Sequence, residues 1–376
     1  MHDQTNVILR CRGPVSLWRL GSWGEIRMYF NVFSDTRSTV EGYLIPDGFS
    51  AKPQISVQRN GEMLGPFPCD IFLAGPYDHK HHETGIVGFR LDEAKVPGIG
   101  DAMDLEISDA ESGLVFYRRL LPGQHIMKRI FRLETQFVPH QEFDRSLKPY
   151  FQFHAAGADK YGSETVRQML EIVHQPSTYV SGRVMLKGVQ QYLTQDTIRI
   201  TSLRDPFYEL AIRLWSIAAS KRRRLSFVSE RDEILFQPAV TYLADTNFAD
   251  YDDIRRKLRS APKDILSLFE SPFTHQFVAL NPTDKVSRDG ISEALDALSQ
   301  FTIFSANEMD AQLAIDVAEL LEIDDMSVSF SPVRSPFLEL ADVLREIKVL
   351  EHVLENDLIL FYFIKRAQER AQKGGI

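Results

Sequence analysis

The sequence predicts an α/β domain built on a parallel sheet and preceded by an all-β sandwich. Up to about residue 120, short stretches of alternating polar and apolar residues are separated by turn signals. From about residue 126, strand patterns and helix patterns alternate along the chain, which is typical of parallel strands joined by crossover helices. The length of 376 residues suits at least two domains. We therefore predict a β-sandwich accessory domain at 1–125 and an α/β domain at 126–376.

In the front half, five segments have the period of a half-buried strand. One of them ends in Asn60-Gly61, a strong signal for a two-residue hairpin turn. Glu111-Ser112-Gly113 predicts a second turn, and no long helix pattern interrupts the series. The five predicted strands are 25–33, 55–61, 85–91, 105–109 and 114–117. Such a domain offers a surface for a glycan or a protein partner.

In the second half, strands are predicted at 150–154 and 198–204, each followed by a helix. The first helix, 165–173, has Val166, Met169, Leu170 and Val173 on one face. The mixed, basic segment 121–148 is interpreted as a linker. Further helices are predicted at 207–219, 292–298, 311–321 and 337–372.

Composition and charge narrow the class of protein. The formal net charge of -9 argues against general binding to nucleic acid, which needs a basic surface. Cys11 and Cys69 are the only cysteines, too few for a disulfide framework or a zinc site. The N-terminus lacks the pattern of a signal peptide, and the richest apolar run, 358–364, is too short to span a membrane. These features predict a cytoplasmic protein without a transmembrane segment.

Residues 157–165 form the first candidate phosphate site. Gly157 and Gly162 have the spacing of a P-loop, and glycines allow a tight path that points amides at a phosphate. Ser163 stands where a P-loop has its lysine, and Lys160 lies inside the loop instead. The alternative is an ordinary loop in which Ser163 or Thr165 caps the following helix.

Arg204-Asp205-Pro206 is the second candidate, at the end of a β-branched strand. Ligands in open α/β sheets bind beyond the carboxyl ends of the strands, and a guanidinium can hold a phosphate with two hydrogen bonds. The alternative is a helix start in which Arg204 pairs with Asp205 or Glu209. Both candidates are expected at the same edge of one sheet.

The order of these segments resembles the sulfotransferases that use 3′-phosphoadenosine 5′-phosphosulfate, especially the carbohydrate-type branch. Residues 159–165 resemble the family's phosphosulfate loop, and Ser181-Gly182-Arg183 followed by 198–206 resembles its second signature, a glycine-led pair, a strand and Leu-Arg-Asp-Pro. Residues 293–304 and 356–362 resemble its later helix–strand unit and its closing helix. The resemblance covers about 148–370 and not the β-rich front.

The resemblance implies a P-loop-like fold and transfer of a sulfonyl group to a saccharide or glycolipid hydroxyl. Lys160 would then neutralise charge on the transferring group, and Arg204 would hold the 3′-phosphate of the donor. Ile212 occupies the position of a serine that binds this phosphate in the family, and Ser216 is the nearest substitute. The remaining donor-binding candidates are the loop residues Gly162, Ser163 and Thr165 and, from its place in the chain, Arg334.

A general base is harder to assign. Arg183 stands where the family often has a histidine, and a guanidinium cannot act as a base near neutral pH. His154 and Glu164 are the candidates that remain, although a strand-end histidine and an acidic residue in a helix's first turn are common structural features.

Two other clusters attract attention. Lys221-Arg222-Arg223-Arg224 is either a solvated helix end or a clamp for an anionic group. His79, His81, His82 and Glu83 have the residue types of a metal site but lie in a segment that reads as a polar loop.

Three functions fit the sequence. The first is sulfonyl transfer from 3′-phosphoadenosine 5′-phosphosulfate. The second is a catalytically silent, sulfotransferase-like scaffold or glycan- or nucleotide-binding protein in polysaccharide assembly, which the missing serine and histidine favour. The third is a nucleotide-dependent kinase, which the position of Lys160 disfavours.

Overall fold

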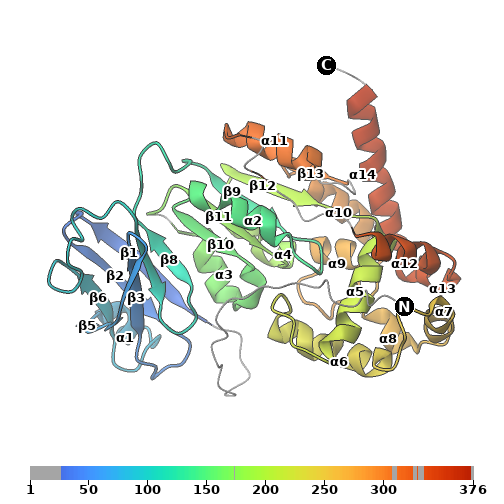
Figure 1. Ribbon diagram of the computed structural model, residues 1–376, viewed down its shortest axis with the longest axis horizontal. Helices are drawn as coiled ribbons and strands as arrows, with labels where there is room; N and C mark the ends of the chain where they lie inside the picture. Colours follow the sequence, from blue (N-terminus) through green and yellow to red (C-terminus); the bar gives the residue numbers. More distant parts are fainter. Residues whose placement is uncertain (1–26, 173, 307–310, 325–327, 329–333, 374–376) are drawn as a thin grey trace, which may run out of the picture.

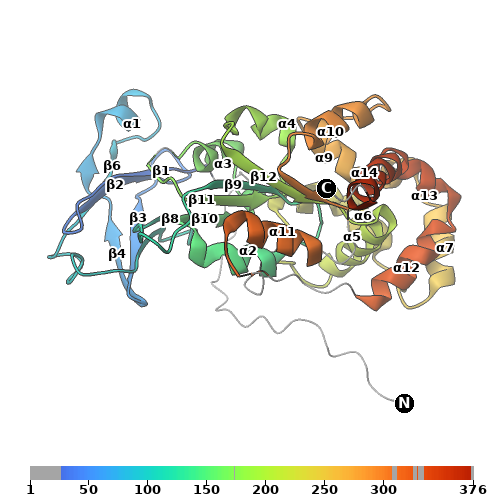
Figure 2. The same ribbon diagram turned by 90° about the horizontal axis from the view of Figure 1, so that it is seen from above.

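The structure of the chain, a computed structural model, describes residues 27–172, 174–306, 311–324, 328 and 334–373. A β-rich N-terminal region lies at one end of the molecule, a parallel sheet in the middle and a group of helices at the other end (Figure 1). The view from above shows the same order (Figure 2). The predicted fold class is confirmed at this level: a mixed α/β chain with an antiparallel front and a five-stranded parallel sheet.

The front region consists of two four-stranded antiparallel sheets in a sandwich-like arrangement. The first has the order β1-β2-β6-β5 and the second the order β4-β3-β7-β8. A short helix, α1 (Ala74–Asp78), joins β5 to β6. The strands are β1 (Tyr29–Asp35), β2 (Val40–Ile45), β3 (Gln54–Arg59), β4 (Glu62–Pro68), β5 (Ile71–Phe72), β6 (Ile86–Leu91), β7 (Leu105–Asp109) and β8 (Val115–Arg118).

Alternation along the strands builds the core of this region. Phe30 and Val32 of β1 and Val57 of β3 point inward and belong to one apolar cluster that both sheets share. At the predicted hairpin, Asn60 and Gly61 have φ values of 47° and 84°, the positive values that a type I′ turn requires. The hairpin at Asn60-Gly61 is therefore confirmed.

The parallel sheet has the order β10-β11-β9-β12-β13. All its neighbouring strands run parallel, and Ile130 of β9 pairs with Tyr179 of β11 on one side and Ile198 of β12 on the other. The strand that comes first in the chain is thus the central one. The strands are β9 (Arg129–Leu133), β10 (Phe153–Ala156), β11 (Thr178–Gly182), β12 (Thr197–Ser202) and β13 (Ile303–Ser305).

The interpretation of 121–148 as a linker is wrong. This segment contains β9 and the helix α2 (Gln141–Leu147). Arg129 and Arg132 give β9 a basic appearance, yet Arg132 is buried among acidic partners, so the strand fits the interior.

Helices cover the sheet and form the far end of the molecule (Figure 1). Asp205 caps α5 by accepting hydrogen bonds from the amides of Phe207 and Tyr208, with Pro206 at the first helical position, as the sequence predicts. Short 3₁₀ turns occupy Lys148–Tyr150, Ala158–Lys160 and Gln190–Tyr192. The helices beyond α2 are α3 (Ser163–Leu170), α4 (Leu186–Val189), α5 (Pro206–Ser220), α6 (Glu230–Leu243), α7 (Tyr251–Arg259), α8 (Lys263–Ser267), α9 (Pro272–Val278), α10 (Gly290–Leu298), α11 (Ala311–Leu321), α12 (Ser335–Arg345), α13 (Lys348–Val353) and α14 (Glu355–Lys373).

The predicted long helix at 337–372 is three helices, α12, α13 and α14. The chain leaves the helical conformation at Ile347, which has extended dihedral angles and is itself buried. Asp357 near the start of α14 accepts hydrogen bonds from the amides of Phe273 and Thr274, so α14 begins where it can cap α9. The apolar run 326–330 lies outside the described residues except for Val328.

The two regions share a continuous core. Phe30 of β1 stacks on Phe153 of β10 with ring centroids 6.2 Å apart, and both belong to the same apolar cluster.

Among the described helices, none is both long and apolar enough to cross a membrane.

Candidate functional site

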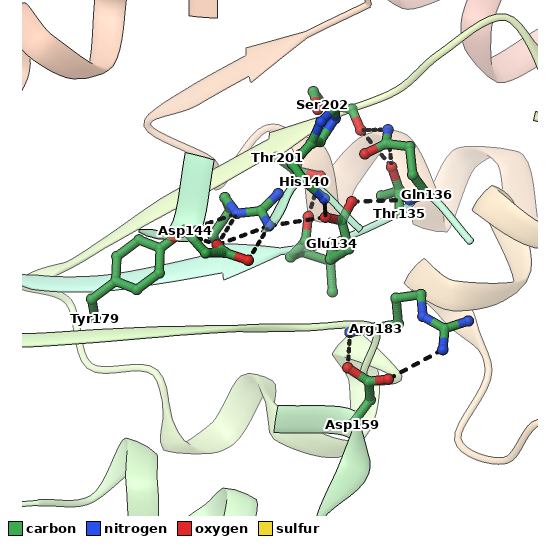
Figure 3. A network of polar contacts seen from close by, with 12 residues as sticks. Glu134, Thr135, Gln136, His140, Asp144, Asp159, Tyr179, Arg183, Thr201 and Ser202 are labelled. Atoms are coloured by element: carbon green, nitrogen blue, oxygen red, sulfur yellow. Dashed lines mark hydrogen bonds and ion pairs between the residues drawn. The ribbon is translucent and has the colours of Figure 1, made fainter. Parts of the chain in front are cut away.

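The loop after the central strand β9, residues 134–140, lies at the carboxyl edge of the parallel sheet. This is where an α/β protein of this topology holds a ligand. Neighbouring segments from α2, β11 and β12 contribute a dense set of polar side chains (Figure 3). We refer to residues 134–140 as the central loop.

The Glu134 carboxylate occupies the inside of the central loop. It accepts hydrogen bonds from the amide of Gln136 (3.1 Å) and the amide of His140 (2.7 Å). It also pairs with Nη2 of Arg132 at 2.9 Å, and its side chain is 1% exposed. Backbone amides that converge in this way form an anion site, and here the anion is the chain's own side chain.

Arg132 compensates two buried carboxylates at once. Its Nε lies 3.1 Å from Asp144, and the Tyr179 hydroxyl donates a 2.6 Å hydrogen bond to the same carboxylate (Figure 3). Burial alone would lower the pKa of Arg132, but Asp144 and Glu134 raise it well above its usual range. Burial, with the charge of Asp144, raises the pKa of Tyr179, so the phenol keeps its proton. Arg132 and Tyr179 therefore both keep their protons near neutral pH.

A second carboxylate engages the central loop from α5. Glu209 is fully buried, accepts a 2.7 Å hydrogen bond from the amide of Phe137 and pairs with Nε of Arg213 at 2.8 Å. Burial raises the pKa of Glu209, although Arg213 and the amide of Phe137 act against that rise. Three amides of the central loop are thus bound to two carboxylates of the chain.

Side chains of the central loop also tie it to the end of β12. Thr135 Oγ1 and Nε2 of Gln136 both donate to the carbonyl oxygen of Ser202, the latter at 2.9 Å. Gln136 Nε2 donates to Thr135 Oγ1 as well, at 2.9 Å. These contacts fix the loop against the sheet.

Arg204 lies beside the central loop. Its Nη2 is 3.5 Å from Nδ1 of His140, and its guanidinium carbon is 5.7 Å from the centre of the Tyr208 ring. Burial and the charge of Arg204 hold the pKa of His140 well below its usual value. Asp205, a predicted alternative partner, pairs with Arg345 of α12 at 2.7 Å.

Two other predicted donor-binding residues, Arg334 and Ser216, lie against or on α5, the helix that follows Arg204. Arg334 is exposed, and its amide donates a 3.2 Å hydrogen bond to the Tyr208 hydroxyl, so the chain segments of Arg334 and Arg204 meet at this tyrosine. Ser216 is 1% exposed on α5, one turn beyond Ile212, and its hydroxyl has no hydrogen-bond partner among the described residues.

Lys160 and its loop lie elsewhere along the same edge. They follow β10, which is the outermost strand on the side of the sheet opposite β13, and both β11 and β9 separate β10 from β12. Lys160 is exposed at the end of a 3₁₀ turn, with its side chain beside Gly157. Lys160 and Arg204 therefore share the edge of one sheet, as predicted, with two strands between the strands that carry them.

The other residues of the 157–165 loop have structural surroundings. Gly162 precedes α3, Ser163 is its exposed first residue, and Glu164 pairs with Arg167 at 3.9 Å on the surface. Thr165 is buried: its Oγ1 accepts a 2.7 Å hydrogen bond from the amide of Met28 and donates to the Met28 carbonyl. The loop thereby joins the parallel sheet to the front region.

Neither His154 nor Arg183 offers a ready proton acceptor. His154, the second residue of β10, stacks on Tyr179 and lies 2.7 Å from the carbonyl oxygen of Asp144 through Nε2. A carbonyl only accepts, so this nitrogen carries the proton. Burial lowers the pKa of His154 to about 4. Arg183 is bound between Asp232 (2.5 Å) and Asp159 (3.3 Å), and its own amide donates to Asp159.

The histidine cluster of the front region has separate contacts. His82 is buried with Nε2 2.7 Å from the Ala51 carbonyl, while His81 packs against Tyr29. Within the described ranges, no group of three or more metal-ligating side chains comes together.

The sequence did not predict a site at the central loop, because this loop contains none of the glycines or lysines that are typical of a phosphate-binding loop. Its one signal is position: it follows the apolar run Ile130-Phe131, which opens the α/β half of the chain. No family model, curated protein or solved structure matches the chain, so the site rests on its own geometry.

Proposed function

We propose that this chain is a catalytically silent protein of sulfotransferase-like architecture that serves as a scaffold or a glycan-binding module in polysaccharide assembly. One observation carries the proposal: the Glu134 carboxylate already binds the amides of Gln136 and His140.

A phosphosulfate donor needs open amides and a nearby cation at the loop that follows the central strand. In this chain Glu134 and Glu209 accept from three of those amides, and the central loop contains no lysine or arginine. A donor phosphate would have to displace these carboxylates from the amides, and would leave the carboxylates buried without those hydrogen bonds. The central loop is therefore unfavourable for binding the donor.

The remaining catalytic requirements point the same way. Lys160 belongs to the outermost strand's loop and not to the loop beside Arg204. His154 is neutral and its Nε2 hydrogen is engaged, and Arg183 cannot accept a proton near neutral pH. Positioning and charge supply most of the acceleration in transfers of this type, and the residues that would supply them here lie at separate loops.

The second candidate is transfer of a sulfonyl group from 3′-phosphoadenosine 5′-phosphosulfate to a saccharide or glycolipid hydroxyl. It is favoured by Arg204 at the end of β12, with the buried hydroxyl of Ser216 on the helix that follows. In that reaction Arg204 would hold the 3′-phosphate and Lys160 would act on the phosphosulfate.

Calorimetric titration with 3′-phosphoadenosine 5′-phosphate, with ATP and ADP alongside, separates the two. A silent protein gives no saturable heat and no turnover of the sulfonyl donor in a sample whose melting curve is cooperative. Micromolar binding that requires the 3′-phosphate, and that Arg204→Lys weakens tenfold or more, would overturn the silent assignment.

Complementation supplies the positive test. In cells that lack this chain, Lys160→Ala should restore polysaccharide formation as fully as the wild type, because a scaffold does not need the lysine. Loss of complementation with normal protein levels would favour the enzyme.

A further inference from the structure

A cavity of about 480 Å³ lies between α5 and α6, away from Lys160. Its volume is within the range of small-molecule sites. It begins at the ring of Phe137 from the central loop and runs along the second half of α5. We refer to it as the α5–α6 cavity.

The buried lining of the cavity includes one hydroxyl without a hydrogen-bond partner among the described residues. This hydroxyl belongs to Ser216, which lines the cavity and is 1% exposed. A serine or threonine in a helix can bond its hydroxyl to the carbonyl four residues earlier, as Thr241 of α6 does with Gln237, but Ser216 makes no such bond. Leaving a buried hydroxyl unpaired costs about 1 to 3 kcal/mol. A ligand oxygen that reaches Ser216 would remove that cost.

The walls are apolar and held in place. The Phe137 ring meets the Phe236 ring edge to face, with centroids 5.6 Å apart. Arg183 and Arg213 lie 5.0 and 5.5 Å from the Phe137 centroid, so the ring has little freedom to move. The remaining apolar wall is Ile217, Leu225, Val228 and Val240. These walls suit a hydrocarbon or aryl body. Of the other polar lining residues, Ser220 already donates to the Ile217 carbonyl and Gln237 is exposed.

The opening carries cations that can change partners. Lys221 and Arg224 line it with side chains 52% and 62% exposed. Lys221 is 3.7 Å from Asp245, and Arg224 is 2.8 Å from Glu233, which also lines the cavity. Exposed pairs of this kind contribute about 0 to 1 kcal/mol, so an entering anion can displace them at little cost. The other lining carboxylate, Asp232, is already neutralised by Arg183.

We infer that the α5–α6 cavity binds an amphipathic anion, with an apolar acyl or aryl body between Phe137 and Phe236 and an acidic head group at Lys221 and Arg224. Ser216 bonds to an oxygen at the inner end of the body where the ligand has one. This site is independent of the proposed silent function, since it uses neither Arg204 nor the amides of the central loop.

Decanoate and decyl phosphate are the probes, titrated calorimetrically into the full chain below the concentrations at which they form micelles. Decanol tests the body without the charge, and inorganic phosphate tests the charge without the body. The inference predicts saturable binding of both anionic probes, at least tenfold tighter than either decanol or phosphate.

The basic segment 221–224 contains a matched pair of variants that tests where the head group binds. Lys221→Ala/Arg224→Ala should weaken decanoate binding about tenfold, which corresponds to about 1.4 kcal/mol. Arg222→Ala/Arg223→Ala removes the same charge from residues that do not line the cavity and should change the affinity less than twofold. Equal effects of the two double variants would overturn the head-group assignment.

Filling the cavity tests the body. Val240→Trp should abolish binding of both probes, and Val228→Trp serves if the first variant does not fold. Undiminished binding in a folded tryptophan variant, or no binding of either probe to the folded wild type, would overturn the inference. Probe binding without binding of 3′-phosphoadenosine 5′-phosphate would leave the silent assignment intact.

Discussion

The loops after β9 and β10 are both strand-to-helix junctions at one edge of one sheet, yet they differ in what fills them. The central loop at 134–140 has no glycine and is occupied by the buried carboxylates of Glu134 and Glu209. The 157–165 loop has two glycines and a lysine and is partly exposed at the outermost strand. The loop with the phosphate-binding composition is thus remote from Arg204, and the loop beside Arg204 carries its own anion.

This difference teaches that strand order, more than local composition, decides which junction can serve as a ligand site. A central strand brings its loop next to loops from both neighbours, whereas an edge strand has one neighbour. In this chain the central loop contains a buried ionic cluster, whereas the 157–165 loop contacts the front region through Thr165. Four substitutions test how far the two loops really differ.

The largest effect is expected at Arg132 in the central loop's ionic cluster. Arg132→Met leaves Glu134 and Asp144 buried without their cation, which should lower the free energy of unfolding by about 3 to 5 kcal/mol. Arg129→Met, at the first residue of the same strand, loses one hydrogen bond to the Ile172 carbonyl and should lower the free energy of unfolding by about 1 kcal/mol. Guanidinium denaturation measures both, and similar losses would contradict a cluster that holds the central loop.

His154 links the two loops: it lies on β10, but its ring bonds to the Asp144 carbonyl in α2, the helix that follows the central loop. Its pKa is about 4 in the folded chain, lowered chiefly by burial, against 6.5 ordinarily. Its neutral form therefore stabilises the fold above pH 6.5, and this stability is lost as the pH falls from 6.5 through 4.

Between pH 7 and pH 5 the wild type should lose about 2 kcal/mol more than His154→Gln, whose amide can still donate to Asp144. Urea denaturation at both pH values measures the difference. Equal losses in the two proteins would mean that His154 titrates normally in the folded state.

Thr165 tests whether the 157–165 loop is a joint to the front region. Thr165→Val leaves the amide of Met28 without its acceptor and should lower the free energy of unfolding by about 1 to 2 kcal/mol. Ser163→Ala, two residues earlier and exposed, should change it by less than about 0.5 kcal/mol. A larger loss for Ser163→Ala than for Thr165→Val would refute this assignment.

The smallest effect is expected at Lys160. The side chain is exposed, so Lys160→Ala should shift the free energy of unfolding by no more than about 0.5 kcal/mol. A melting temperature within error of the wild type checks this, and a clear loss would reveal a partner for Lys160 that the described residues do not provide.

Local patterns in the sequence predicted the elements that depend on local chemistry. Asn60-Gly61 predicted its hairpin, and Arg204-Asp205-Pro206 predicted the junction of β12 and α5, because turn dihedrals and helix caps are set within a few residues.

Local patterns of this kind could not predict the structure of the central loop. Its character depends on Glu209, more than seventy residues away in the chain, accepting from Phe137, and on Arg132 being buried rather than exposed. A buried arginine in a strand looks like a surface residue in the sequence. The pairing of β9 with β11 brings Tyr179 to it, and the packing of α2 on the sheet brings Asp144.

The most direct test of the central claim is hydrogen–deuterium exchange at the amides of Gln136, Phe137 and His140, with and without 3′-phosphoadenosine 5′-phosphate. Because carboxylates of the chain already bind these amides, we predict strong protection that the nucleotide leaves unchanged. Weak protection without the nucleotide, and protection gained when it is added, would contradict the claim and identify the central loop as a donor site.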